Sequence, residues 1–400
     1  MPRYKRASFT FFTIEADELY DVRSLLQGRY EISEVTKLFA ISPLTAAKHA
    51  IPPRDLELLL KIPNDRWSTE GDLLRLGANE DQLKEMARRG LLVSDEHDAD
   101  LSELNRRATV LDSKKWHPYA ALYHFLTRSS EYQWPFSYGL AEAEAEARAQ
   151  RFVAKHGAPP DPFHALPGAP RIDLPLIEKT GELYELLKRR RTMRAFDATR
   201  MMSADDLSTL LYYTYGCHGY VHISPEVVLL HRTSPSGGSR HPVEVYPLIL
   251  RVEGVAPGVY HYNMGDHALE RIRGHGLEEA QELAVELGGG QEHLRSAHVI
   301  FIMTARFFRN FWKYQRTSKS YGVVLMDVAH LSQTLYLIAT DLNLGVVMSA
   351  AINAPLIDEV LGVDGYEEGA LALCGCGVRV AEGEPDYGLT FRSFVPRRPI

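Results

Sequence analysis

The sequence predicts an α+β protein in which helices pack against a sheet that is not doubly wound. Apolar runs rich in β-branched residues indicate strands at residues 226–232, 244–252, 258–262, 297–304 and 369–374. Apolar periodicity indicates helices between them, at residues 277–287, 319–342 and 355–361. Strand and helix are mixed without the strict alternation of a doubly wound sheet. We therefore expect one sheet with helices packed on it.

Length and composition set the general class of the molecule. The chain has 400 residues, more than a single core usually holds, so we expect two domains. Hydrophobic residues make up 45% and charged residues 24%, as in ordinary globular proteins. The formal net charge of -7 provides no overall attraction to nucleic acid, so we expect no nucleic-acid partner.

The cysteine content and the first residues of the chain indicate the cellular compartment. Cys374 and Cys376 form a lone CxC without the second pair that a zinc site needs, so no metal site is expected. Near the start, Glu15 and Asp17 interrupt any apolar stretch, which argues against a signal peptide. No window approaches the roughly 18 to 20 apolar residues of a membrane span. These features predict a reduced, cytoplasmic protein with no membrane segment.

The first third of the chain holds a clear helix signal. We expect a strand at residues 8–15 and short helices from there to about residue 60. Asn79 and Gln82 have the spacing of a capping box, and the helix that they start ends at Gly90. Leu91 opens a short apolar run that predicts a strand. A helix, a glycine and then a strand is how winged-helix units end.

A solvated helix and a proline-rich stretch mark the expected domain boundary. A helix is predicted at residues 117–129, and residues 141–151 are almost pure helix formers with little to bury. Residues 156–170 are rich in proline, as linkers are. The sequence therefore predicts an N-terminal accessory domain, a helical and proline-rich linker, and a larger C-terminal domain, over residues 1–135, 136–175 and 176–400.

The strongest periodicity in the chain lies in residues 321–342. Apolar residues recur every three or four positions, the spacing of one buried helical stripe, at Leu325, Val328, Leu331, Leu335, Ile338 and Leu342. Just upstream, Lys313 and Tyr314 stand in an aromatic run, Phe307, Phe308, Phe311 and Trp312. Burial there would lower the pKa of the lysine and raise that of the tyrosine, which is one route to an acid or base near neutrality.

Two further stretches carry groups that suit a phosphate and a flat ligand. Arg190, Arg191, Thr192 and Arg194 put three cations and a hydroxyl at a helix end, where they form a candidate phosphate cradle. A basic run that favours the helix dipole is the alternative. Between two predicted strands, the loop from Ser234 to Pro242 holds paired glycines that let backbone approach a flat ligand. An ordinary turn is the alternative there.

Four motifs follow one another in the order and spacing of the nitroreductase-like flavoproteins. They are RRTMRAF, SPSGGSRHPVEVYPL, WKYQRTSKSYGVVLMDVAH and GVVMSAAINAPL. More narrowly, the chain resembles the SagB-type peptide dehydrogenases, which use FMN to oxidise azolines in ribosomally made peptides, and among them the peptide maturation dehydrogenases. The similarity covers about residues 176–385. The resemblance implies a central antiparallel sheet flanked by helices, and a homodimer, because such proteins build their FMN sites between subunits.

The resemblance also implies roles for particular residues. The arginine-rich run would hold the FMN phosphate, through Arg190, Arg191, Thr192 and Arg194. The SPSGG loop would lie against the flavin ring, through Pro235, Ser236, Gly237, Gly238 and Arg240. Backbone groups after the long helix would pass the pyrimidine edge, at Ser349, Ala350 and Ala351. Lys313 and Tyr314 match a lysine and tyrosine pair that is thought to serve the dehydrogenation.

The chain departs from the family pattern just after this pair. Family members commonly continue KY-x-x-R-x-Y-R and then D-x-GH, whereas this chain has KYQRTSKSY and DVAH. Asp327 and His330 are kept, and alanine replaces the glycine. The departure leaves the expected flavin fold unaffected and bears on which substrate is used.

The expected chemistry is removal of two hydrogens from a ring C–C bond, with a base taking the proton at Cα and hydride leaving Cβ for the flavin. Lys313 and Tyr314 are adjacent, and neighbours on a regular helix or strand point apart. Both side chains can contact one substrate only where the backbone is irregular. Otherwise, one of the two positions the other. A salt-bridged lysine beside a packed aromatic remains the structural alternative for this pair.

The N-terminal piece is similar to the small winged-helix domains that bind leader peptides in ribosomal peptide maturation systems. It would hold the precursor peptide or a cyclase partner; an accessory helical domain without a peptide role is the alternative. For the whole chain, the leading hypothesis is an FMN-dependent dehydrogenase of a modified peptide. The alternatives are a general NAD(P)H-dependent nitro or quinone reductase and a non-catalytic partner in a maturation complex.

Overall fold

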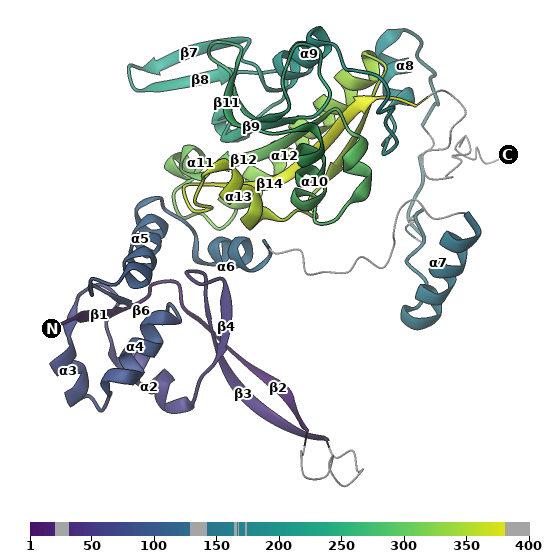
Figure 1. Ribbon diagram of the computed structural model, residues 1–400. Helices are drawn as coiled ribbons and strands as arrows, with labels where there is room; N and C mark the ends of the chain where they lie inside the picture. Colours follow the sequence, from purple (N-terminus) through teal and green to yellow (C-terminus); the bar gives the residue numbers. More distant parts are fainter. Residues whose placement is uncertain (21–31, 129–141, 164–165, 167, 173, 381–400) are drawn as a thin grey trace.

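The computed structural model describes residues 1–20, 32–128, 142–163, 166, 168–172 and 174–380. Figure 1 shows these residues in an N-terminal part (residues 1–128), a lone helix, and a C-terminal part (residues 174–380). The lone helix is α7 (Glu142–His156), and none of its residues whose burial is described is buried.

The N-terminal part combines two small antiparallel sheets with helices. The first sheet has the order β5-β1-β6, from Ser68–Thr69, Arg3–Arg6 and Leu92–Ser94. The second has the order β2-β3-β4, from Phe11–Tyr20, Ile32–Ser42 and Ala47–Ala50. The helices are α2 (Pro53–Lys61), α3 (Glu70–Arg75), α4 (Glu80–Arg88), α5 (Ala99–Ser113) and α6 (Pro118–Leu126).

In this part the predicted capping box is confirmed, whereas the predicted short helices are partly wrong. The Asn79 side chain accepts from the backbone N–H of Gln82 at 2.8 Å, and the Asn79 backbone N–H donates to the Gln82 side chain, so the capping box is confirmed. The strand predicted after Gly90 is also confirmed. The short helices expected before residue 50 are wrong, because β3 and β4 occupy that region. β3 is rich in β-branched residues and pairs with β2 over ten positions, which outweighs its weak helical periodicity.

The C-terminal part is built on a six-stranded antiparallel sheet of order β11-β10-β9-β12-β14-β13. The strands, in chain order, are β9 (Val243–Ile249), β10 (Gly258–Asn263), β11 (Ala268–Gly274), β12 (Val299–Arg306), β13 (Leu344–Ser349) and β14 (Glu368–Val378). A separate hairpin pairs β7 (Gly219–Ser224) with β8 (Val227–His231). The expected α+β class, with a central antiparallel sheet, is confirmed.

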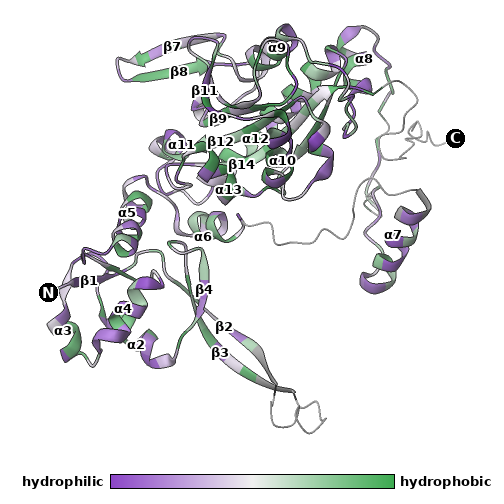
Figure 2. Cartoon of the chain, viewed as in Figure 1, coloured by the Kyte–Doolittle hydropathy of each residue, from purple (hydrophilic) through white to green (hydrophobic). Residues whose placement is uncertain are grey.

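Helices cover both faces of this sheet, which explains its continuous apolar strands. On β12, Val299, Phe301 and Met303 share one core with α9 (Ala204–Tyr215) and α12 (Ser320–Asp341), whereas Ile300 and Ile302 face α10 (Leu277–Leu287) and α13 (Ala354–Leu361). Figure 2 shows the apolar strands between these layers. The remaining elements are α8 (Glu182–Arg189), η1 (Gly237–Ser239), η2 (Glu292–Ser296) and α11 (Phe307–Tyr314).

Helix α12 is the longest element described and lies where the periodicity predicts it. Val328, Leu331 and Leu335 are buried as expected, but Leu325 is 39% exposed. The buried stripe begins instead at Tyr321 and Val324, one position away, because this end of the helix turns toward the N-terminal part. By length and hydropathy alone, α12 is the one described helix that could cross a membrane; here it packs against the sheet and α9.

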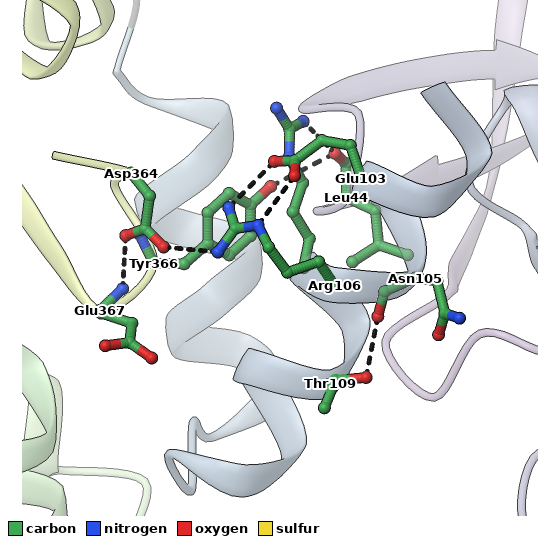
Figure 3. A network of polar contacts seen from close by, with 9 residues as sticks. Leu44, Glu103, Asn105, Arg106, Thr109, Asp364, Tyr366 and Glu367 are labelled. Atoms are coloured by element: carbon green, nitrogen blue, oxygen red, sulfur yellow. Dashed lines mark hydrogen bonds and ion pairs between the residues drawn. The ribbon is translucent and has the colours of Figure 1, made fainter. Parts of the chain in front are cut away.

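The two parts meet along α5, α6 and the turn that precedes β14. Arg106 on α5 donates to Glu103 at 2.7 Å and to Asp364 of the turn at 2.9 Å, so it lies between the two carboxylates (Figure 3). Its guanidinium lowers the pKa of Glu103 to about 2. The Tyr366 hydroxyl donates to the carbonyl oxygen of Leu44 at 3.2 Å. The turn is thereby fastened to the N-terminal part at two points.

A second set of contacts involves α6 and α13. Arg128 forms an ion pair with the buried Asp358. Gly365 has a φ of 73°, and a Cβ there would overlap the guanidinium of Arg128, so only glycine fits. His124 is fully buried, with Nδ1 2.9 Å from the Tyr321 hydroxyl and Nε2 3.1 Å from the Gly365 carbonyl oxygen. Burial, and then the charge of Arg128, lower the pKa of His124 to about 3.

This depressed pKa predicts that the joint between the two parts weakens in mild acid. Between about pH 6.5 and pH 3 the unfolded chain binds a proton at His124 that the folded chain does not, so stability falls as pH falls through that window. The loss amounts to about 2 kcal/mol at pH 5. In denaturant titrations at pH 7, 6 and 5, His124→Gln should show a shallower pH dependence than the wild type. The exposed His97→Gln variant serves as the control and should keep the wild-type slope. Equal slopes for wild type and His124→Gln would contradict the assignment.

Candidate functional site

The loop between β8 and β9, residues 234–242, is fastened to the polar face of α12. The Ser236 hydroxyl donates to Asp327 Oδ2 at 2.5 Å, and the Gly237 N–H donates to Asp327 Oδ1 at 3.2 Å. The hydroxyls of Ser234 and Thr334 are 2.6 Å apart. Asp327 is 3% exposed, and burial raises its pKa despite these hydrogen bonds. The loop thus closes over a buried carboxyl group.

The paired glycines are required by close packing. A Cβ at Gly237 would overlap the side chain of Val323 on α12. Gly238 has a φ of 61°, and a Cβ there would overlap the side chain of Lys313. Glycine is therefore needed at both positions for the backbone to lie against α12 and Lys313.

Lys313 and Tyr314 both lie on this glycine turn. They are the last two residues of α11, and the next residue, Gln315, has an irregular backbone with φ 49° and ψ -143°. The Lys313 ammonium is 5.6 Å from the centre of the Tyr314 ring, and the Tyr314 hydroxyl is 3.4 Å from the place of a Gly237 Cβ. The two adjacent side chains therefore reach one place where the helix ends.

The burial that we expected around this pair is wrong. Lys313 is exposed and Tyr314 is half-buried. The reason is the orientation of α11, which buries Phe307, Asn310 and Phe311 and leaves its C-terminal turn facing outward. The Lys313 side chain is therefore open to solvent in the single chain.

The arginine-rich run lies beside the C-terminal half of α12. Arg190 ends α8, and its guanidinium lies 5.4 Å from the centre of the Tyr336 ring on α12. The Thr192 hydroxyl is 3.3 Å from the Tyr336 hydroxyl. Arg191 donates to the carbonyl oxygen of Lys188 at 2.7 Å. Arg194 is half-buried. Arg190, Arg194 and the Thr192 hydroxyl thus lie near Tyr336, whereas Arg191 is exposed.

The segment after β13 joins this group. Tyr336 accepts from the Met348 N–H at 3.0 Å, so the tyrosine links Thr192 to the end of β13. Gln291 donates to Ser349 Oγ at 2.8 Å and to the Ala351 carbonyl oxygen at 2.9 Å, which holds the turn that follows. Ala350 is exposed at that turn. Tyr336 and Gln291 were missed by sequence reasoning, although a tyrosine interrupting the apolar pattern of α12 was a signal.

The predicted residues therefore form two groups beside α12. The glycine loop, Lys313 and Tyr314 lie near Asp327, and the arginine-rich run and residues 349–351 lie near Tyr336. Nine residues of helix separate these anchors, about 14 Å along the axis. Nine residues are about two and a half helical turns, so Asp327 and Tyr336 project from opposite sides of α12.

A cavity of about 400 Å³ opens beside the glycine loop. Its lining mixes aromatic, cationic and acidic side chains from both parts of the chain: Lys114, Glu226, Val227, Arg240, Arg306, Phe308, Arg309, Trp312, Glu367 and Glu368. Arg240 lies over the Trp312 ring at 5.4 Å, and Arg309 donates to the Arg240 carbonyl oxygen at 3.0 Å. Sequence reasoning missed this cavity, because it combines segments far apart in the chain.

Known proteins resemble the C-terminal part. The family model described as the nitroreductase family matches residues 187–378. MJ1384 of Methanocaldococcus jannaschii, named as a nitroreductase, is 32% identical over 200 residues, covering 49% of this chain and 91% of that protein. The trifolitoxin-processing protein TfxB of Rhizobium leguminosarum is 30% identical over 174 residues, covering 43% of this chain and 46% of TfxB.

Solved structures share this region at lower similarity. A structure described as a nitroreductase from Anabaena variabilis is 27% identical with a TM-score of 0.41, covering 49% of this chain and 38% of that one. A chain of the Escherichia coli microcin synthetase McbBCD complex is 20% identical with a TM-score of 0.43, covering 60% and 95%. This chain thus spans less than half of TfxB and of the Anabaena chain. The chain matches nearly the whole of the Methanocaldococcus protein and also matches the family model. It therefore belongs to the nitroreductase family.

Proposed function

We propose that this nitroreductase-family oxidoreductase binds FMN along α12 and dehydrogenates a modified, ribosomally made peptide. Proteins of the family typically bind flavin. The observation that carries the proposal is the placement of Lys313 and Tyr314 on the Gly237–Gly238 turn, where the SagB-type resemblance expects an amine and a phenol beside the flavin ring. The cytoplasm is the proposed location, in keeping with three free cysteines.

The residues present fit FMN. Arg190, Arg191 and Arg194, with the Thr192 hydroxyl, supply cationic and directional donors for a phosphate at the Tyr336 end. At the other end, Val323 and Lys313 fill the space beside the glycine turn, so a flat ring would lie against the Lys313 and Tyr314 side chains. These roles extend to Pro235, Ser236 and Arg240 of the loop, and to Ser349, Ala350 and Ala351 at the exposed turn after β13. When bound, FMN supplies the acceptor for a hydride.

In this proposal Lys313 and Tyr314 handle the proton. Substrate enters beside them from the side of the cavity, where Trp312 and Phe308 offer aromatic surface. One of the two side chains takes the proton from Cα, and the neighbouring group stabilises the charge that results. Aromatic product makes the step downhill, and the protein has mainly to orient the ring.

Two further observations support a peptide substrate. TfxB, which shares 30% identity with this chain, is named for the processing of trifolitoxin. The N-terminal part also carries a groove of about 630 Å³ between the sheet β2-β3-β4 and α2, with an apolar lining: Ile14, Thr36, Lys37, Leu38, Ala50, Ile51, Pro52, Pro53 and Leu56. A winged-helix-like recognition domain for the peptide or its cyclase partner is our proposal for this part.

FMN binding should depend on the attachment of the glycine loop. Asp327→Ala removes the acceptor for Ser236 and Gly237, which should cost about 1 to 3 kcal/mol of stability. The variant should bind FMN more weakly, measured by titration of the apoprotein and by the visible absorbance of purified protein. Asp341→Ala, an exposed aspartate at the end of the same helix, is the control. A wild-type protein that stays colourless with added FMN would rule out the cofactor.

Mass spectrometry of the peptide encoded beside the gene tests the reaction. Incubation with the FMN-loaded protein and oxygen should remove two hydrogens per site, and the Lys313→Ala, Tyr314→Phe double variant should lose this activity by about 100-fold or more. Lys155→Ala, an exposed lysine on α7, is the control. Turnover near the wild-type rate in the double variant would refute the catalytic assignment. Rapid anaerobic bleaching by NADPH without peptide oxidation would favour a general reductase, and no oxidation by the wild type would favour a non-catalytic partner.

A homodimer is proposed from the resemblance and from exposed apolar residues. On α8, Leu183 and Leu187 are 59% and 47% exposed, and on the β7–β8 hairpin Tyr220 and Ile223 are 70% and 65% exposed. Surfaces of this kind mark interfaces. Light scattering should give the mass of two chains, and a Leu183→Glu, Leu187→Glu variant should shift the protein to the monomer. Glu185→Lys on the same helix should leave the dimer intact. A wild-type monomer with FMN bound would contradict the proposal.

A further inference from the structure

Helix α11 is packed between the two parts of the chain. The side that carries Phe307, Asn310 and Phe311 is buried, while Lys313 at its end lies on the turn at Gly238. The helix therefore has a glycine turn against its last residues and a second layer beneath its buried face. That second layer comes from the N-terminal part.

Trp116 is the centre of the layer beneath α11. It follows α5 and is fully buried. The centre of its ring lies 4.6 Å from that of Phe307, 5.0 Å from that of Phe311 and 6.0 Å from that of Tyr321. Its indole N–H donates to the Tyr366 carbonyl oxygen at 3.0 Å, which fixes the ring in its plane.

Polar contacts hold the rest of the segment 307–321. Arg316, just after Lys313 and Tyr314, forms an ion pair with Asp112 of α5 at 2.7 Å. Asn310 donates to the Ser320 carbonyl oxygen at 2.7 Å, so α11 is tied to the start of α12. His124 of α6 contacts the Tyr321 hydroxyl at 2.9 Å. Trp116 thus packs on the start of the segment, Asp112 pairs with Arg316 within it, and His124 contacts Tyr321 at its end. The Asn310 contact lies within the segment itself.

We propose that Trp116 and Asp112 are positioning residues for the Lys313–Tyr314 pair. The proposal rests on the proposed function of that pair. The N-terminal part is then a component of the active site, because it sets where α11 ends and so where the amine and the phenol lie over the glycine turn. A misplacement of about 1 Å at such groups lowers turnover by about 100-fold.

A purely peptide-docking role for the N-terminal part makes a different prediction. Variants in a docking unit raise KM for the peptide and leave kcat and the segment 307–321 unchanged. Variants of positioning residues lower kcat, leave KM nearly constant, and loosen that segment even without substrate or FMN. The two readings therefore separate on a KM-against-kcat split and on amide hydrogen exchange.

The first experiment replaces the indole in the full-length protein. Trp116→Ala should lower kcat for peptide oxidation by about 100-fold with little change in KM. In the apoprotein, the same variant should speed amide exchange in residues 307–321 and leave the central strand β12 protected. Trp116→Phe keeps an aromatic ring against Phe307 and Phe311 and should restore most of kcat and of the protection.

The second experiment avoids the core, so it stands where Trp116→Ala fails to fold. The side chains of Asp112 and Arg316 are 43% and 44% exposed, so Asp112→Arg and Arg316→Asp each change a surface charge. Each single variant should lower kcat and speed exchange in residues 307–321, and the double reversal should restore both. The Lys48–Glu15 pair has nearly the same exposure, 43% and 41%, and its reversal should change neither quantity.

Failure of this inference is distinguishable from failure of the proposed function. Wild-type turnover in the Lys313→Ala, Tyr314→Phe variant overturns the proposed function and with it the catalytic consequence inferred here. Loss of activity in that variant, together with unchanged kcat and unchanged exchange in Arg316→Asp and in any folded Trp116→Ala protein, overturns the positioning role alone. Faster exchange with a reduced kcat that the double reversal rescues supports it.

Discussion

Helix α12 is buried in two cores at once, and the arrangement of the site depends on this. Tyr321 and Val324 at its start belong to the core of the N-terminal part, whereas Leu331 and Leu335 belong to the core beneath the sheet. A helix packed at both ends cannot rotate without opening one of the two cores. Its polar face is therefore fixed, and with it the spacing between Asp327 and the Tyr336 end.

The buried carboxyl group of Asp327 illustrates how the loop is held. Taking a carboxylate out of water is costly unless donors replace the water. The Ser236 hydroxyl and the Gly237 N–H supply those donors, but burial remains the largest influence and raises the pKa of Asp327. The loop cannot leave without losing both hydrogen bonds to Asp327, so the glycine turn has a defined position before any ligand binds.

Local chemistry allowed the sequence to predict much of the fold. The capping box at Asn79 and the apolar runs of the predicted strands each act within a few residues, and each is confirmed. The long hairpin strand β3 was missed because its stability comes from pairing with β2. At the site, the motifs indicated the glycine loop. The exposure of Lys313, the role of Tyr336 and the cavity at Trp312 depend on how distant segments pack, and no local pattern encodes that.

The same packing joins the family region to the N-terminal part. The family model matches residues 187–378, yet Phe307, Phe311 and Tyr321 within it are buried only together with residues such as Trp116. Burial of each such side chain contributes about 1.5 to 3 kcal/mol, so three of them represent on the order of 5 kcal/mol, comparable with the net stability of a domain. A chain cut before residue 187 would expose this aromatic surface beside the proposed catalytic pair. The physical unit that carries the site therefore includes α5 and α6, although sequence similarity begins after them.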